Sequence, residues 1–169
     1  MMVRTRRLAL PILTASALGI FPACSSSSST GDSGGSSAPA ITSSATCPSP
    51  EAGSGTPVGA TERNSSIELD THSLKAGSTT FSVDNAGPST HQFVVLATDL
   101  APDSLPVSEG FGNPVDEKGK GVTLIDKIKD ISVGCSASLT LDLDSGNYVV
   151  ICNLPGHYAS GMYAPLKVT

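Results

Sequence analysis

Three side chains able to bind a soft metal ion lie close together near the C-terminus. Residues 148–162 (YVVICNLPGHYASGM) contain Cys152, His157 and Met162, which offer a thiolate, an imidazole and a thioether. A run of β-forming residues, 148–151, ends at the cysteine, and a Pro-Gly turn separates the cysteine from the histidine. One thiolate, two imidazoles and a weak axial methionine make up a blue-copper site, so this stretch lacks only a second imidazole.

His91 is the predicted source of the second imidazole. It opens a strand directly after the turn sequence 85–90 (NAGPST), where its side chain can reach the end of a sandwich. The remaining histidine, His72, follows polar residues in a predicted loop, and we interpret it as exposed to solvent. Zinc is the alternative metal, but structural zinc sites favour closed tetrahedra of cysteine and histidine over methionine.

Short runs with a two-residue hydrophobic period must position these side chains. The runs are predicted at 67–69, 81–83, 91–97, 139–143, 148–151 and 165–168, with Gly-, Asn- or Pro-containing turns between several of them. Such runs separated by turn signals predict an antiparallel β-sandwich. The four metal-binding side chains are then expected to converge at one end of that sandwich.

One segment interrupts this pattern. Residues 100–121 contain three prolines and four glycines and are predicted to form a long irregular loop. Residues 122–131 (VTLIDKIKDI), which follow it, fit either a short helix or an edge segment, and periodicity does not decide between them.

The two histidine-containing motifs resemble the copper-binding elements of the cupredoxins, small blue-copper electron-transfer proteins. The resemblance covers residues 66–169 and is carried by Asn-x-Gly-Pro…His at 85–91 and by Cys-x4-His-x4-Met at 152–162. The spacing of the second motif is similar to that of rusticyanin and sulfocyanin. The resemblance implies an all-β, cupredoxin-like Greek-key β-sandwich that binds one type 1 copper ion.

By the same resemblance, His91, Cys152 and His157 are the equatorial ligands and Met162 is the axial ligand. Backbone amides of the turn before His91 and of the loop after Cys152 are expected to orient these ligands. The residue after the first histidine is often asparagine in the family and is Gln92 here, which bears on the hydrogen bonds around the cysteine sulfur.

The predicted function is one-electron transfer without chemistry on a substrate. Copper storage, delivery or resistance at the same site is the alternative, but the chain has only 3 methionines and no Met-rich or His-rich tract. Enzymatic activity is not expected, since oxidases and nitrite reductases need further histidines for a second copper centre and only His72 is left over. A binuclear centre would need a second cysteine in residues 152–162, which we call the ligand loop, where Gly156 and Ser160 stand instead.

The first 23 residues are predicted to be a secretory signal peptide. Arg4, Arg6 and Arg7 precede an apolar run, 8–21, that is short and contains a proline, unlike a transmembrane anchor. The sequence Phe-Pro-Ala-Cys, ending at Cys24, resembles a bacterial lipobox, in which the cysteine is lipidated. An ordinary signal peptide cut near Cys24 is the alternative, and export by the Sec or the twin-arginine route stays open.

Residues 24–61 are rich in Ser, Gly, Ala, Thr and Pro and are predicted to form a disordered tether, which leaves 62–169 as the copper-binding domain. This organisation predicts a lipid-anchored monomer on the extracytoplasmic face of the cell membrane, with redox proteins of the cell envelope as partners. The net charge is −5, and removal of a signal segment with three arginines and no acid leaves −8. Such acidity argues against binding to nucleic acid.

Two cysteines remain after Cys24 is assigned to lipid and Cys152 to metal. Cys47 and Cys135 are predicted to form a disulfide, because paired cysteines are the usual case in an exported domain. The bridge would pin the end of the tether to the sandwich and contribute about 4 kcal/mol by the loop-entropy model. Two free thiols that handle copper are the alternative.

Overall fold

Nine strands and one short 3-10 helix make up the elements of residues 47–169, the part of the chain that the computed structural model describes. The predicted signal peptide, Cys24 and the tether up to residue 46 lie outside the described residues. The elements are β1 (Thr56–Arg63), β2 (Ser66–Leu69), β3 (Ser73–Leu74), β4 (Gly77–Asn85), β5 (His91–Ala97), β6 (Thr123–Ile131), β7 (Ser136–Leu143), β8 (Gly146–Ile151), η1 (Tyr158–Ser160) and β9 (Tyr163–Val168).

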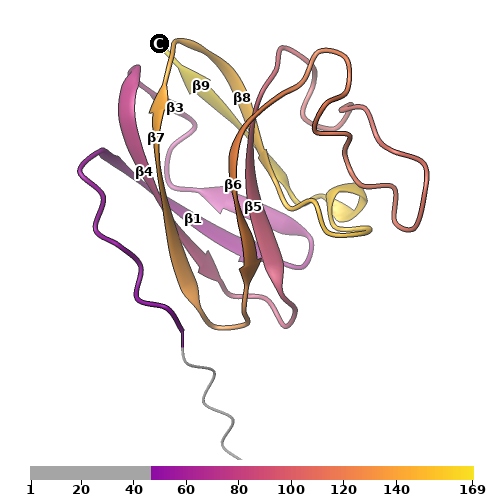
Figure 1. Cartoon of the computed structure of the whole chain (residues 1–169), viewed down its shortest axis with the longest axis horizontal. Coiled ribbons are helices and arrows are strands. Elements are labelled where there is room, and N and C mark those ends of the chain that lie inside the picture. The colour runs from indigo at the N-terminus through magenta and orange to yellow at the C-terminus, as the bar shows by residue number, and fades with distance from the viewer. Residues whose placement is uncertain (1–46) are drawn as a thin grey trace, which may run out of the picture. The chain divides into compact units, whose positions relative to one another are not determined.

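The strands form two sheets that pack face to face (Figure 1). One sheet has the order β2-β1-β4-β7 and the other has the order β3-β9-β8-β5-β6. This arrangement confirms the predicted all-β sandwich. Most strand pairs are antiparallel, as predicted, but β1 runs parallel to β4 and β3 runs parallel to β9, so both sheets are mixed.

The central strands of the five-stranded sheet are buried on both faces. In β5, Phe93 and Val95 face the core between the sheets, whereas Val94 and Leu96 belong to a second apolar cluster beneath the long loop. In β8 the residues alternate in the same way between the two clusters. This double burial explains why both strands are continuous apolar runs in the sequence.

The domain begins earlier than predicted. β1 starts at Thr56, so residues 56–61, assigned to the tether from their composition, belong to a strand of the four-stranded sheet. Its small, Gly- and Pro-containing sequence gives a weak strand signal, and the parallel pairing with β4 holds it in place. The sequence-based boundary at residue 62 is therefore corrected to the start of this strand.

Residues N-terminal to β1 are also tied to the sandwich. The predicted Cys47–Cys135 disulfide is confirmed, and the Ser138 hydroxyl donates a hydrogen bond to the carbonyl of Glu51 at 2.9 Å.

Residues 123–131 form β6, an edge strand beside β5, which settles the choice between helix and edge segment. The β5–β6 ladder is irregular: His91 pairs with Ile131, but Phe93 pairs with Ile128, so β6 bulges between them. Within residues 47–169 no helix is long and apolar enough to span a membrane.

Candidate metal centre

Three of the four predicted ligands lie at the same end of neighbouring strands. His91 is the first residue of β5, Cys152 follows the last residue of β8, and Met162 precedes the first residue of β9. All three are fully buried, and the sulfur-containing pair belongs to the core between the sheets. Because β5, β8 and β9 are adjacent in one sheet, these residues gather at one end of the sandwich, which we call the ligand pole.

His157 reaches the ligand pole from the loop between β8 and β9. It immediately precedes η1, and its carbonyl accepts hydrogen bonds from the N–H groups of Ser160 and Met162 at 3.1 and 3.2 Å. Gly161 ends this turn with a φ of 107°, and a Cβ there would lie 2.9 Å from the carbonyl oxygen of Ser65. Glycine is therefore required for its backbone conformation and for space.

The donor atoms of His91, Cys152 and His157 form a small triangle. The two Nδ1 atoms lie 3.2 Å apart, and the Cys152 Sγ lies 3.8 Å from that of His91 and 3.3 Å from that of His157. A metal ion roughly 2.0–2.3 Å from nitrogen and sulfur donors, and in their plane, would hold them roughly 3.5–4 Å apart. The triangle is close to that size, so the three donors fit one metal ion. Met162 adjoins them through its carbonyl, which accepts the Cys152 N–H at 3.1 Å.

Burial decides the protonation of these donors. It lowers the pKa of His91, which the neighbouring His157 lowers further, and it lowers the pKa of His157. Both imidazoles are therefore neutral and able to bind a metal near neutral pH. Burial raises the pKa of the Cys152 thiol to about 11, although backbone N–H groups of Leu154 and Gln92 oppose the rise. A metal ion must displace this proton, so binding at neutral pH releases it.

Two backbone amides orient the cysteine sulfur. The Gln92 N–H donates to the Cys152 Sγ at 3.3 Å, and the Leu154 N–H also stabilises the thiolate, which lowers the pKa of the cysteine. The last β5–β8 pair joins Val94 to Ile151, so the Gln92 N–H lies beyond the ladder and is available to the sulfur. Because the donor is the backbone, glutamine in place of the family's asparagine leaves this hydrogen bond intact.

The turn between β1 and β2 supports both segments that carry ligands. The Ser160 hydroxyl donates to the Asn64 carbonyl at 3.1 Å, and the Ser89 hydroxyl donates to the Asn64 side-chain oxygen at 2.9 Å. Gly87, in the turn before His91, lies so close to the ring that a Cβ would be 2.6 Å from the His91 Nε2. A larger residue there would displace the imidazole.

The long loop, residues 100–121, is bound to the ligand loop (Figure 1). The Asn153 side chain accepts from the Val115 N–H at 2.7 Å and donates to the Val115 carbonyl at 3.0 Å. It also donates to Glu117 at 3.0 Å, and Glu117 forms an ion pair of 2.6 Å with Lys127 of β6. Asn153 was not among the predicted site residues, although its place directly after Cys152 marks it in the sequence.

Three further hydrogen bonds connect the long loop to the other end of the ligand loop. The Gly156 N–H donates to the Gly112 carbonyl at 2.9 Å. The Tyr158 hydroxyl donates to the Pro102 carbonyl and accepts from the Leu105 N–H, both at 2.9 Å. The long loop therefore holds the segment on both sides of His157.

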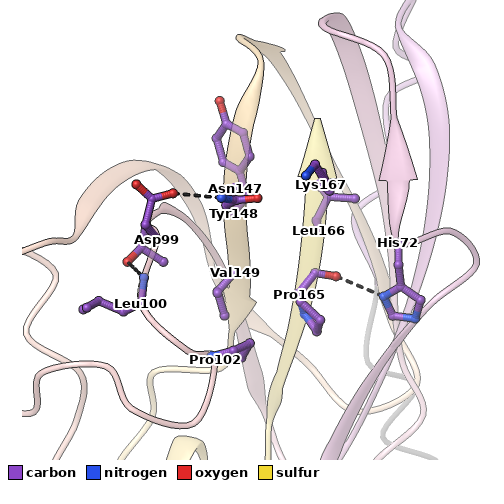
Figure 2. Close-up of a pocket in the computed structure, with 11 residues that line it drawn as sticks. His72, Asp99, Leu100, Pro102, Asn147, Tyr148, Val149, Pro165, Leu166 and Lys167 are labelled. Atoms are coloured by element: carbon purple, nitrogen blue, oxygen red, sulfur yellow. Dashed lines mark hydrogen bonds between the residues drawn. The ribbon is translucent and has the colours of Figure 1, made fainter. Parts of the chain in front are cut away.

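His72 lies apart from the ligand pole, as predicted. It is exposed, and its ring Nδ1 donates to the carbonyl of Pro165 at 3.0 Å (Figure 2). It borders a pocket of about 240 Å³ that shares no residue with the His91, Cys152 and His157 cluster. Among the described residues, that cluster is the only group of three or more His, Cys, Asp or Glu side chains with metal-binding spacing.

Glu62 is a buried acid that the sequence-based prediction missed. It lies in β1 with no exposed surface, and neither carboxyl oxygen has a hydrogen-bond partner among the described residues. Burial raises its pKa to about 8, and its charge contributes to the raised pKa of Cys152. A neutral carboxyl is therefore the dominant form near pH 7.

Residues 69–169 match the family described as the sulfocyanin (SoxE) domain. Reduced auracyanin from Roseiflexus castenholzii has 20% sequence identity and a TM-score of 0.50, over 69% of this chain and 99% of that chain. Its likeness confirms the predicted cupredoxin-like sandwich.

Two other solved structures have lower TM-scores. An azurin from Methylomonas sp. strain J has 20% identity and a TM-score of 0.47, over 68% of this chain and 98% of that chain. Reduced rusticyanin has 17% identity and a TM-score of 0.47, over 69% of this chain and 81% of that chain. The search of curated proteins found no match.

In the metal-free protein we expect Glu62 to make the free energy of unfolding fall as the pH rises. Its carboxyl keeps its proton up to about pH 8 in the folded protein, whereas the ordinary pKa is 4.5. The free energy of unfolding therefore falls between about pH 4.5 and 8, and at pH 7 it is about 3 kcal/mol lower than it would be with an unshifted pKa. Urea denaturation at a series of pH values measures this slope.

Glu62→Gln should remove that part of the slope, since the amide does not ionise. Glu68→Gln, which changes an exposed carboxyl in β2, is the matched control and should keep it. An unchanged slope in Glu62→Gln would contradict the assignment.

Proposed function

The chain belongs to the sulfocyanin (SoxE) domain family, and on that premise we propose that it is a blue-copper electron carrier anchored outside the cytoplasmic membrane. Its cofactor is one type 1 copper ion. The observation that carries the proposal is the triangle of one sulfur and two nitrogen atoms, 3.2 to 3.8 Å apart, at the ligand pole.

We assign His91, Cys152 and His157 as the equatorial ligands and Met162 as the axial ligand. Copper bound by such a donor set supplies a one-electron change between its cupric and cuprous states. The soft thiolate suits the cuprous state, and the imidazoles suit both. A weak thioether adds little coordination and favours neither geometry.

The protein's own contribution is to hold these donors in one arrangement. His91, Cys152 and Met162 are fixed by strand ends, and His157 is fixed by η1 and the long loop. Little rearrangement is then needed when the charge at the site changes. His157 is the one equatorial donor that is not fully buried, so we assign its edge as the point of electron exchange with a partner.

The proposal includes no catalysis on a substrate. The described residues hold one cluster with metal-binding spacing, and His72 lies outside it. Storage or delivery of copper is the second candidate function. Full burial of His91 and Cys152 favours retention of the metal over its release.

The proposed location rests on the N-terminal sequence. A charged and apolar segment over 1–23, the Phe-Pro-Ala-Cys sequence ending at Cys24 and the Ser-rich stretch after it support export and lipid attachment. The protein would then act as a monomer at the membrane, and its partners would be redox proteins of the cell envelope.

Addition of Cu(II) to the purified protein should produce an intense visible absorption from thiolate-to-copper charge transfer and the matching EPR signal. Cys152→Ser should abolish the absorption, and His91→Ala should weaken or abolish it. His72→Ala is the matched histidine control and should leave both spectra unchanged. A colourless cupric protein would refute the proposed site.

Self-exchange kinetics should separate the two candidate functions. An electron carrier is expected to exchange electrons rapidly between its oxidised and reduced forms while it keeps its copper in the presence of a chelator. Line broadening in NMR spectra of mixed redox states measures the exchange, and absorbance measures copper loss. Slow exchange together with ready transfer of copper to an acceptor would favour delivery.

Cys24→Ala should move the protein from the membrane fraction to the soluble exported fraction, because the lipid attachment point is lost. The copper spectrum should not change, since the ligands lie elsewhere. Metabolic labelling with a fatty acid provides the direct readout. Equal membrane association of the wild type and Cys24→Ala would contradict the lipid anchor.

A further inference from the structure

Asn85 joins two turns at the ligand pole. It ends β4, is 2% exposed, and its side chain forms three hydrogen bonds to backbone groups. Its Oδ1 accepts from the Gly87 N–H at 2.9 Å, and its Nδ2 donates to the carbonyls of Ser89 and Ile131, both at 2.8 Å. Because the side chain is fully satisfied in a buried place, its removal leaves three backbone groups without their partner.

Two of those backbone groups belong to the turn that leads into His91. Gly87 and Ser89 lie between β4 and β5, and His91 follows two residues after Ser89. The third group belongs to Ile131, the residue paired with His91 across the β5–β6 ladder. Asn85 therefore fixes the backbone of His91 from the preceding turn and from the neighbouring strand.

The ring of His91 has little else to orient it. A metal-binding histidine ordinarily donates its second ring N–H to a carboxylate, a carbonyl or water. The Nε2 of His91 is buried and has no hydrogen-bond partner among the described residues. Backbone position and packing must then set the direction of the His91 Nδ1. The Asn85 hydrogen bonds, which fix that backbone, therefore matter more here than in a site where a hydrogen bond to the second ring nitrogen holds the histidine.

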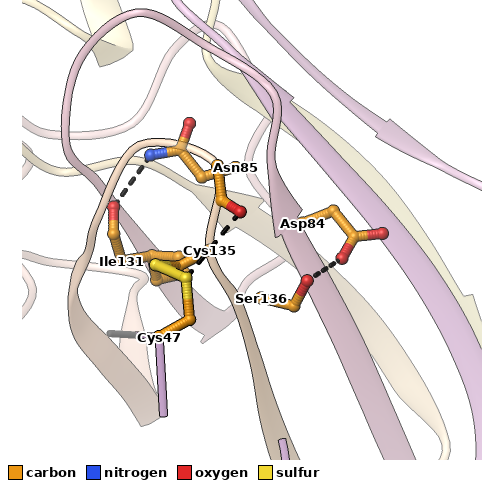
Figure 3. The surroundings of a disulfide bond; sticks show 7 residues. Cys47, Asp84, Asn85, Ile131, Cys135 and Ser136 are labelled. Atoms are coloured by element: carbon orange, nitrogen blue, oxygen red, sulfur yellow. Dashed lines mark hydrogen bonds between the residues drawn. A yellow bond between two sulfur atoms is a disulfide. The ribbon is translucent and has the colours of Figure 1, made fainter. Parts of the chain in front are cut away.

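The backbone of Asn85 is tied to the disulfide. Its N–H donates to the Cys135 carbonyl, and its carbonyl accepts from the Gly134 N–H, both at 3.0 Å. Cys135 is bonded to Cys47, and Figure 3 shows this disulfide beside Asn85, with the hydrogen bond from Asn85 to Ile131. The turn from Ile131 to Cys135 is thus held by the disulfide at one end and by the Asn85 side chain at the other.

We propose that Asn85 is a positioning residue for His91 and that through it the copper site depends on the Cys47–Cys135 disulfide. The inference rests on the proposed copper function and adds to it two groups that do not touch the metal. Loss of either is expected to let the turn before His91 move, which alters the metal–imidazole bond without removing a ligand.

The test compares copper-loaded wild type with Asn85→Ala, Asn85→Asp and the double variant Cys47→Ser/Cys135→Ser. Asn85→Asp keeps the acceptor for Gly87 but loses both donors. Ser136→Ala is the matched control. Ser136 follows Cys135 and Asp84 precedes Asn85, and the Ser136 hydroxyl donates a hydrogen bond to Asp84 and none to the Asn85 side chain. The readouts are the visible and EPR spectra, the reduction potential and the rate of copper release to a chelator.

We expect both Asn85 variants to show a shifted spectrum and potential, with copper release on the order of tenfold faster, the factor that corresponds to one buried hydrogen bond. The disulfide variant should shift in the same direction by less, and Ser136→Ala should match the wild type.

Folded Asn85 variants with wild-type spectra, potential and release would overturn the positioning role, as would equal changes in Ser136→Ala. An unchanged disulfide variant would overturn the link to Cys47–Cys135, and this arm decides the case if the Asn85 variants do not fold. Failure of the wild type itself to give a blue cupric form would instead refute the copper function.

Discussion

Confinement of one thiol and two neutral imidazoles within 3.8 Å of one another, with His91 and Cys152 fully buried, is the constraint on which the rest of the structure depends. Three electron-rich donors so close together, two of them fully buried, have a cation as their natural partner. Hydrogen bonds from the surrounding backbone hold the donors in this arrangement. Each ligand-bearing segment is accordingly held at more than one point.

Those points come from distant parts of the chain. The β1–β2 turn contacts the segments of His91 and His157 through Asn64, and the long loop binds both sides of the ligand loop. The strands provide the coarse placement, because His91, Cys152 and Met162 end up side by side whenever β5, β8 and β9 pair in this order. The loops then fix the exact positions of the donor atoms, because hydrogen bonds to backbone groups are more directional than apolar packing.

The ligand set could be predicted from the sequence because its information is local: residue types, their spacing and strand signals beside them. Apolar alternation likewise revealed most strands. β1 was missed because residues 56–61 have small side chains and are held by parallel pairing with a strand some twenty residues away. Glu62 was missed for the same reason, since its inward direction is evident only once β1 is known. For β6, contact with β5 decided what periodicity left open.

The disulfide also determines where the polypeptide leaves the domain. Cys47 is bonded to Cys135, which neighbours Asn85 and the turn into His91, so the N-terminal connection departs from the same end of the sandwich as the donors. If Cys24 carries the proposed lipid, the chain that leads to it joins the domain at the donor end, so the width of the sandwich does not lie between that end and its point of attachment.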